Sequence, residues 1–118
     1  MTAVLVVDDE PTLRTVVAEL LRDEGYAVVA VGDGAAALAA LAEAVPDLVL
    51  MDVMMPGMDG YAAFRAMRAH PAGAAAPVVL ASAAADPRDL PAGVAAFLRK
   101  PFDLDDLLAL VARLAGPP

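Results

Sequence analysis

Four charged residues stand where short apolar runs of the sequence end. Asp8 and Asp9 follow the run AVLVV, Asp52 follows LVLM, and Lys100 precedes Pro101. If these runs are neighbouring parallel strands, the carboxylates converge at the carboxyl edge of the sheet. Carboxylate oxygens gathered in this way suit a hard cation such as Mg²⁺. Because a lysine beside them offers a counter-charge to an anion, the residues together predict a site for phosphoryl chemistry.

The elements that must position these residues alternate between strand-like and helix-like segments, which predicts an α/β fold around a parallel sheet. Five short, continuously apolar runs are expected to be strands covered by helices on both faces. They span residues 3–7, 27–31, 47–51, 77–81 and 94–98.

Helices are expected at about 11–24, 35–44, 60–70 and 104–115. The first is the clearest, because Pro11 suits a first helical turn and Gly25 a C-terminal stop. Its expected apolar stripe is Leu13, Val16, Val17, Leu20 and Leu21, and that of the last helix is Leu104, Leu107, Leu108 and Val111. Leu110 and Leu114 widen the apolar arc of the last helix. They indicate either an interaction surface or packing, and the sequence leaves both open.

The stretch between Ser82 and Val94 is the weakest element of the sequence. Pro87 is able to start a helix, but Pro91 would interrupt it almost at once. A stub or an irregular loop is therefore expected there.

The length of 118 residues leaves room for one compact domain, expected to span residues 1–118. No apolar stretch is long enough to cross a bilayer, and we see no signal-peptide pattern. The absence of cysteine excludes disulfides and fits a reducing compartment, so we expect a cytoplasmic location and no membrane contact. The net charge of −8 argues against direct nucleic-acid binding.

Four strings resemble the receiver domain of bacterial two-component response regulators, the CheY-like superfamily: VLVVDDEP, LVLMDVMMPGMDG, PVVLASA and FLRKPF. They occur in the order found in that family and extend over nearly the whole chain. The resemblance implies a flavodoxin-like, doubly wound five-stranded parallel sheet with strand order 2-1-3-4-5. The stretch from Ser82 to Lys100 is shorter than usual in the family, which implies a shortened or irregular fourth helix.

The resemblance also implies a role for each acidic residue of the candidate site. Asp52 corresponds to the phospho-acceptor of the family. Asp8 and Asp9 correspond to the acid pair that holds Mg²⁺ (or Mn²⁺), together with Asp52 and the backbone carbonyl of Met54. Because three close carboxylates repel one another, we expect a raised pKa for at least one of them.

The remaining site residues follow from the same resemblance. Ser82 corresponds to the residue that hydrogen-bonds the phosphoryl group, Lys100 to its ion-pairing partner, and Phe97 to the aromatic switch residue. Lys100–Pro101 matches a dipeptide whose peptide bond is usually cis in the family, which is plausible only before proline.

The implied function is that of a phospho-accepting switch. The chain would take a phosphoryl group from the phosphohistidine of a sensor histidine kinase or a histidine phosphotransfer protein onto Asp52. It would then change conformation to control a downstream effector protein or an output domain missing from this chain. Such a domain catalyses its own phosphorylation and slow dephosphorylation but is not a turnover enzyme.

Three other functions compete with this one. A haloacid-dehalogenase-type phosphohydrolase needs a general acid two residues after its nucleophile, where Met54 stands. A flavodoxin-like cofactor carrier needs a phosphate-binding loop where the acidic run Asp8-Asp9-Glu10 would repel phosphate. A degenerate receiver, acting as a phosphorylation-independent protein-binding module, remains the alternative.

Some candidate residues also have plain structural interpretations. Asp9 or Glu10 is able to cap the first helix, and Asp59 is expected to cap the third. His70, the only histidine, is expected to be an exposed residue at a helix C-terminus rather than a phosphorylation site.

Overall fold

The computed structural model describes residues 1–73 and 75–118. Its five strands form one parallel sheet in the order β2-β1-β3-β4-β5, as predicted. The strands are β1 (Ala3–Val7), β2 (Ala27–Val31), β3 (Leu48–Asp52), β4 (Val78–Ser82) and β5 (Ala96–Arg99). The helices are α1 (Pro11–Asp23), α2 (Gly34–Glu43), α3 (Gly60–Ala69) and α4 (Leu104–Ala115), with short 3-10 turns η1 (Pro71–Gly73) and η2 (Pro87–Asp89). The predicted bounds are correct to within one residue, except that β5 begins two residues later than expected.

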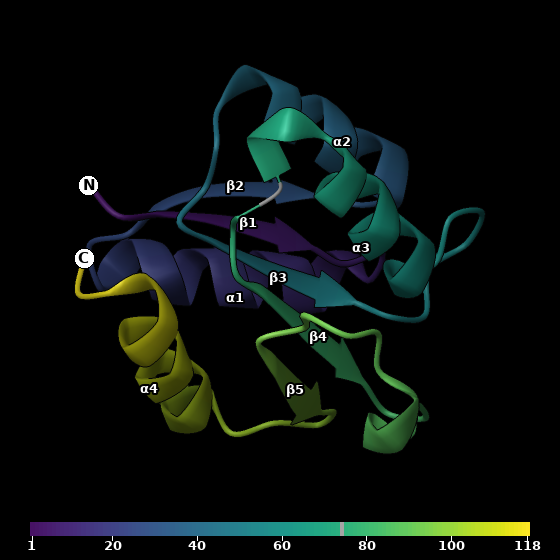
Figure 1. Ribbon diagram of the computed structural model, residues 1–118. Helices are drawn as coiled ribbons and strands as arrows, with labels where there is room; N and C mark the ends of the chain where they lie inside the picture. Colours follow the sequence, from purple (N-terminus) through teal and green to yellow (C-terminus); the bar gives the residue numbers. More distant parts are fainter. Residues whose placement is uncertain (74) are drawn as a thin grey trace.

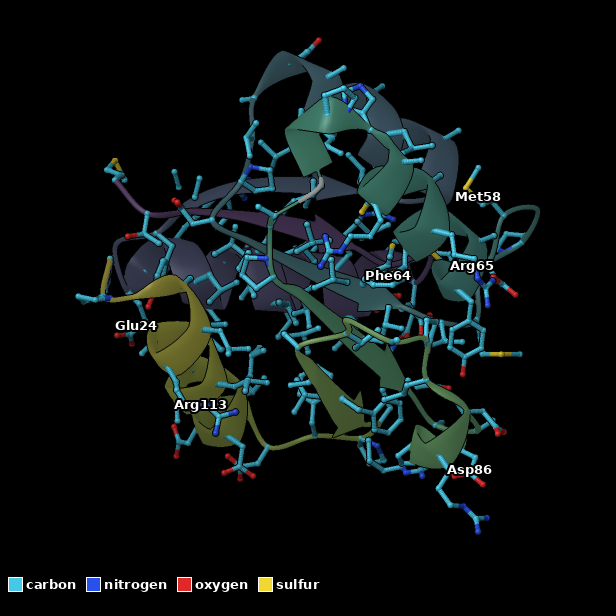
Figure 2. All side chains as sticks on the ribbon, in the orientation of Figure 1. Glu24, Met58, Phe64, Arg65, Asp86 and Arg113 are labelled. Atoms are coloured by element: carbon cyan, nitrogen blue, oxygen red, sulfur yellow. The ribbon has the colours of Figure 1, made fainter. Side chains whose placement is uncertain are left out.

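Helices cover both faces of the sheet: α2 and α3 lie on one face and α1 and α4 on the other (Figure 1). Successive residues of a strand point to opposite faces, so Leu5 of β1 enters the core cluster under α2 and α3 while Val6 enters the other. On α3, Phe64 points inward and its neighbour Arg65 points to solvent (Figure 2). None of the helices described is long and apolar enough to cross a membrane.

Two residues expected in apolar stripes are exposed instead. Val16 is 43% exposed, because the buried face of α1 is centred on Val17, Ala18 and Leu21 and leaves Val16 on its flank. Leu104 is 39% exposed, because it is the first residue of α4 and lies ahead of the turns that cover the sheet. Leu110 and Leu114, by contrast, are partly buried against the core cluster under α1 and α4. The structure therefore favours packing for these two leucines.

The connection between β4 and β5 has no α-helix, which confirms the predicted shortened fourth helix. Only the three-residue 3-10 turn η2 forms there, capped by the Asp86 carboxylate, which accepts a hydrogen bond from the Arg88 N–H at 2.9 Å. Leu90 and Val94 from this loop pack against the core cluster under α2 and α3. Loop side chains thus cover part of the sheet that a helix would otherwise cover.

Gly60, the first residue of α3, lies against the end of β3 where a side chain does not fit. A Cβ there would lie 2.7 Å from Val53 Cα and would also contact the Asp52 carbonyl oxygen. Because backbone atoms cannot yield as a flexible side chain does, we expect Gly60→Ala to lower the free energy of unfolding by about 2 kcal/mol, measured by urea denaturation. Gly34→Ala is the matched control, since Gly34 also begins a helix but meets only the Met58 side chain. An equal loss in both variants would contradict this interpretation.

Candidate functional site

The three acidic residues meet at the carboxyl edge of the sheet. Asp8 directly follows β1 and Asp52 ends β3, and these strands are paired in parallel with Val7 opposite Met51. Oxygen atoms of Asp8, Asp9 and Asp52 lie within 4.8 Å of one another. Asp8 and Asp52 are buried, while Asp9 is exposed. The arrangement presents a cluster of hard oxygen donors that opens to solvent on the side of Asp9.

Lys100 places its ammonium group between two of these carboxylates. It follows β5, and its Nζ lies 2.8 Å from Asp8 Oδ2 and 3.4 Å from Asp52 Oδ2. The backbone holds it there, because the Lys100 N–H donates a hydrogen bond to the Ser82 carbonyl at 3.0 Å. The Lys100–Pro101 peptide bond is cis, as predicted.

Burial and charge act in opposite directions on the ionisable groups of the site. Burial is the main cause that raises the pKa of Asp52 above its ordinary value, the Asp8 charge raises it further, and Lys100 counteracts both. Sequence reasoning expected a raised pKa but attributed it to repulsion alone. For Lys100, burial by itself would lower the pKa, but the hydrogen bond and charge of Asp8 and the charge of Asp52 outweigh it, so the pKa is raised. The lysine is therefore held in its charged form.

The acid pair is not used to cap α1. Glu10 occupies the N-cap position without a side-chain hydrogen bond, so neither it nor Asp9 has the capping role that sequence reasoning left open. The Glu10 N–H instead donates to Asp8 Oδ1 at 2.9 Å. With Oδ2 accepting from Lys100, both Asp8 oxygens are engaged. Asp8 is thus fixed by the protein, whereas Asp9, although its carboxylate belongs to the same cluster, is exposed.

Ser82 ends β4, the strand paired with β3, and Phe97 lies on β5 opposite Leu80 of β4. Ser82 was expected just after its strand, but it is the last residue of β4 and is fully buried. Its Oγ accepts hydrogen bonds from the N–H groups of Ala84 and Ala85 at 3.1 and 3.0 Å, so it faces the β4–β5 loop. Phe97 is partly buried against the core, and the Arg99 guanidinium lies 5.3 Å from its ring centroid.

Asp59 and His70 have structural roles at the two ends of α3. The Asp59 carboxylate caps α3 by accepting a hydrogen bond from the Ala62 N–H at 2.8 Å, as expected. His70 is the C-cap residue after α3 and is only half exposed, and its Nδ1 accepts a hydrogen bond from the Ala72 N–H at 3.1 Å. Met54 lies two residues beyond Asp52 with its side chain 61% exposed.

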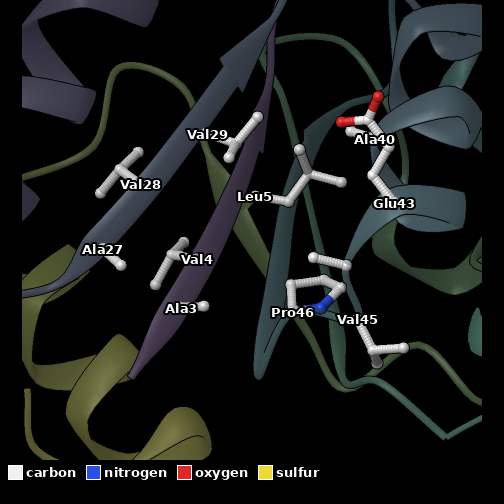
Figure 3. A pocket seen from close by; sticks show the side chains of 11 residues that line it. Ala3, Val4, Leu5, Ala27, Val28, Val29, Ala40, Glu43, Val45 and Pro46 are labelled. Carbon is white, nitrogen blue, oxygen red and sulfur yellow. The ribbon is translucent and has the colours of Figure 1, made fainter. Parts of the chain in front are cut away.

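Two hollows in the surface differ in their relation to the site. A groove of about 430 Å³ opens beside Lys100, between Leu13 of α1 and Phe102 before α4. A smaller one of about 180 Å³ lies where β1 and β2 begin, against the end of α2 (Figure 3). The smaller hollow is lined by apolar side chains and Glu43, and it lies at the end of the sheet opposite Asp8. Only the groove adjoins the charged cluster.

Sequence reasoning missed Arg14, which belongs to the same edge of the sheet. Arg14 lies in the first turn of α1, and its Nη1 donates a hydrogen bond to the Asp8 carbonyl oxygen at 2.8 Å. The one available signal in the sequence was a cation near a helix N-terminus, where positive charge is unfavourable.

Curated relatives of the chain are regulators of about twice its length. The DNA-binding response regulator MtrA of Mycolicibacterium smegmatis is 41% identical over 116 residues, which cover 94% of this chain and 50% of MtrA. The sensory transduction protein RegX3 of the same organism is 36% identical over 115 residues, covering 94% and 49%. The chain thus spans about half the length of the curated relatives it matches.

Solved structures match over almost the whole chain. The receiver domain of the sensor histidine kinase PA1611 from Pseudomonas aeruginosa has a TM-score of 0.89 and 34% identity, covers 98% of both chains, and holds a magnesium ion in its active site cleft. The response regulator TrrA from Thermotoga maritima, in complex with Mg²⁺ and BeF, has a TM-score of 0.86 and 32% identity, covering 97% of this chain and 99% of TrrA.

The family model described as the response regulator receiver domain matches residues 4–112. That range contains every residue of the acidic cluster and all five strands except Ala3, the first residue of β1. Members of this family are signalling domains rather than turnover enzymes. By sequence, strand order and shared structure, the chain belongs to the response regulator receiver domain family.

Proposed function

We propose that residues 1–118 form one phospho-accepting receiver in which Asp52 takes a phosphoryl group from a phosphohistidine. The observation that carries this proposal is the position of the Lys100 ammonium, 2.8 Å from Asp8 and 3.4 Å from Asp52 within a cluster of three carboxylates. Phosphoryl transfer depends on positioning and on charge neutralisation at the phosphoryl oxygens, which this cation is placed to provide. A degenerate binding module would have no need for this complete set of residues.

In the proposed step, a carboxylate oxygen of Asp52 attacks the phosphorus in line with the leaving imidazole. The P–N bond of phosphohistidine breaks as the P–O bond of the acyl phosphate forms, and the departing nitrogen takes up a proton from water. Lys100 opposes the effect of burial on Asp52 and so favours the ionised form that attacks. The Ser82 Oγ accepts from Ala84 and Ala85, so its O–H is able to donate a hydrogen bond to a phosphoryl oxygen.

The donor set fits Mg²⁺ or Mn²⁺. Carboxylates of Asp8, Asp9 and Asp52, with the backbone carbonyl of Met54, would hold the ion through oxygen, the ligand type that hard divalent cations prefer. The bound ion would supply further positive charge against the phosphoryl oxygens. The magnesium present in the PA1611 and TrrA structures supports the same assignment here.

Phosphorylation of Asp52 would change the structure of the surface through Ser82 and Phe97. At present the Ser82 hydroxyl oxygen accepts hydrogen bonds from the N–H groups of Ala84 and Ala85. If the hydroxyl turns toward the phosphoryl group, these hydrogen bonds break. The β4–β5 loop and the space beside Phe97 then change together, which shifts the domain between two populations. Because η2 replaces a helix here, we propose that the effector or output domain senses this loop.

The proposed phosphodonor is a sensor histidine kinase or a histidine phosphotransfer protein in the cytoplasm. The groove beside Lys100, with Leu13 and Phe102 on its walls, is a surface against which such a partner would place its phosphohistidine. The MtrA relatives are named as DNA-binding. Because this chain has a net charge of −8, we assign any such activity to an output domain outside it.

The acyl phosphate is expected to be long-lived. Met54 and Ala84, two residues beyond Asp52 and Ser82, are exposed and have no group that strongly orients a water. We expect Met54→Asn to speed loss of phosphate by about tenfold and Met54→Ala to leave it unchanged, measured on the purified phosphorylated domain. Rapid loss from the parent domain, with no phosphatase present, would contradict the prediction.

The direct test is uptake of phosphate from acetyl phosphate by the purified domain, detected by intact-mass spectrometry with and without Mg²⁺. Uptake that disappears with a chelator supports the proposal. A folded domain that binds Mg²⁺ but takes up no phosphate would be a degenerate receiver instead.

A further inference from the structure

Arg14 makes an unusual contact with the loop that carries the acid pair. It is half-buried in the first turn of α1, and its Nη1 donates a 2.8 Å hydrogen bond to the Asp8 carbonyl. Within the described residues it has no carboxylate partner at 4.0 Å or less. The helix dipole disfavours a cation at this end of a helix. Neither helix stability nor an ion pair explains why the guanidinium lies there.

Gly32, just after β2, provides the space that the guanidinium occupies. A Cβ at Gly32 would lie 2.9 Å from Arg14 Nη1 and 3.7 Å from Arg14 Cζ. The backbone of Gly32 does not itself call for glycine, because only Gly25, Gly57, Gly93 and Gly116 have positive φ. The absence of a side chain at Gly32 therefore leaves room for the Arg14 guanidinium.

The contact fixes the direction of Asp9. The Asp8 carbonyl belongs to the peptide unit that continues into Asp9, so the hydrogen bond from Arg14 sets the orientation of that unit. The preceding peptide unit is held as well, because the Asp8 N–H donates a hydrogen bond to the Val31 carbonyl at 3.1 Å. Because Asp9 is exposed, its carboxylate depends on this backbone for its position in the cluster.

We propose that Arg14 and Gly32 form a positioning pair that aims Asp9 at the cation site. The guanidinium, seated over Gly32, holds the Asp8–Asp9 peptide so that the exposed carboxylate joins the two buried ones. This inference rests on the proposed function, since it takes the acid pair as cation ligands. Arg14 itself touches neither the phosphoryl group nor the cation.

Removal of Arg14 distinguishes positioning from simple electrostatics by the sign of the effect. If Arg14 were only a nearby positive charge, Arg14→Ala would strengthen Mg²⁺ binding by removing repulsion. If it positions Asp9, the same change weakens binding. Groups that orient metal ligands typically contribute tenfold or more, so we expect affinity to fall by about tenfold.

The experiment measures Mg²⁺ affinity by calorimetry and backbone amide shifts by NMR for the parent domain, Arg14→Ala, Gly32→Ala and the double variant. Gly32→Ala retains the charge but displaces the guanidinium, so it is expected to weaken binding similarly. In the Arg14→Ala background it should add nothing further. Before Mg²⁺ is added, amide shifts of Asp9 and Glu10 should already change in both single variants.

Arg22→Ala is the matched control, because Arg22 also belongs to α1 and donates to a carbonyl, that of Val28 at 3.0 Å, but lies far along the helix from the cluster. Its Mg²⁺ affinity should match that of the parent. Urea denaturation of each variant separates lost affinity from lost folding, and Arg14→Lys provides a milder change if Arg14→Ala unfolds. Unchanged or tighter binding in the folded Arg14 variants would overturn the inference. No Mg²⁺ binding by the parent domain would instead overturn the proposed function.

Discussion

Asp52→Asn is expected to abolish phosphate uptake from acetyl phosphate, with a loss of at least about 10³-fold in rate. The amide has nearly the shape of the carboxylate but no anionic oxygen to attack phosphorus. Intact-mass spectrometry of the two domains, incubated side by side with Mg²⁺, measures the difference directly.

Asp59→Asn is the matched control, because Asp59 is an exposed aspartate whose capping role asparagine retains. It should take up phosphate at the parent rate. Undiminished uptake by Asp52→Asn would place the nucleophile at another residue and would remove the basis of the proposed function.

Asp52→Asn should also stabilise the fold near neutral pH. The pKa of Asp52 is raised above 3.8, chiefly by burial, so the folded state favours its neutral form. The stability associated with that form is fully present below 3.8 and is lost as pH rises through the folded-state pKa. The advantage of Asp52→Asn over the parent in urea denaturation should therefore grow from acid to neutral pH.

Lys100→Met is expected to lower the free energy of unfolding by about 3 kcal/mol at neutral pH without divalent cations. Methionine fills similar space but leaves the buried Asp8 and Asp52 carboxylates without their shared counter-charge. This loss in the free energy of unfolding should become smaller as acid protonates Asp52, and also when Mg²⁺ binds the folded state. Uptake of phosphate should also fall about 10²-fold, since one charge that stabilises the transition state is gone.

Arg88→Met is the control for Lys100→Met. Arg88 has a short ion pair with Asp86, at 2.7 Å, but its side chain is 89% exposed. Solvent screens such a pair, so no measurable change in stability is expected. If the two variants behaved alike, the burial of the Lys100 ion pairs would have no energetic consequence, and the lysine would not be needed to stabilise the buried carboxylates.

The sequence by itself determined the sheet and the residues at its carboxyl edge. Short apolar runs of β-branched residues specify strands through local patterning, and each charged residue of the cluster lies within two residues of a strand end. Proline placement likewise predicted that no full helix forms between β4 and β5. These features depend on neighbours close in sequence, which explains why they were readable without the fold.

Only the tertiary structure decided how the side chains at that edge are held. Lys100 lies 92 residues from Asp8 along the chain, and their 2.8 Å contact depends on the order in which strands pack. The complete burial of Ser82 and the exposure of Val16 and Leu104 follow from packing across elements. Arg14 gave only an unfavourable local signal in sequence, because its two contacts, Asp8 and Gly32, come from segments that meet only when β1 and β2 pair.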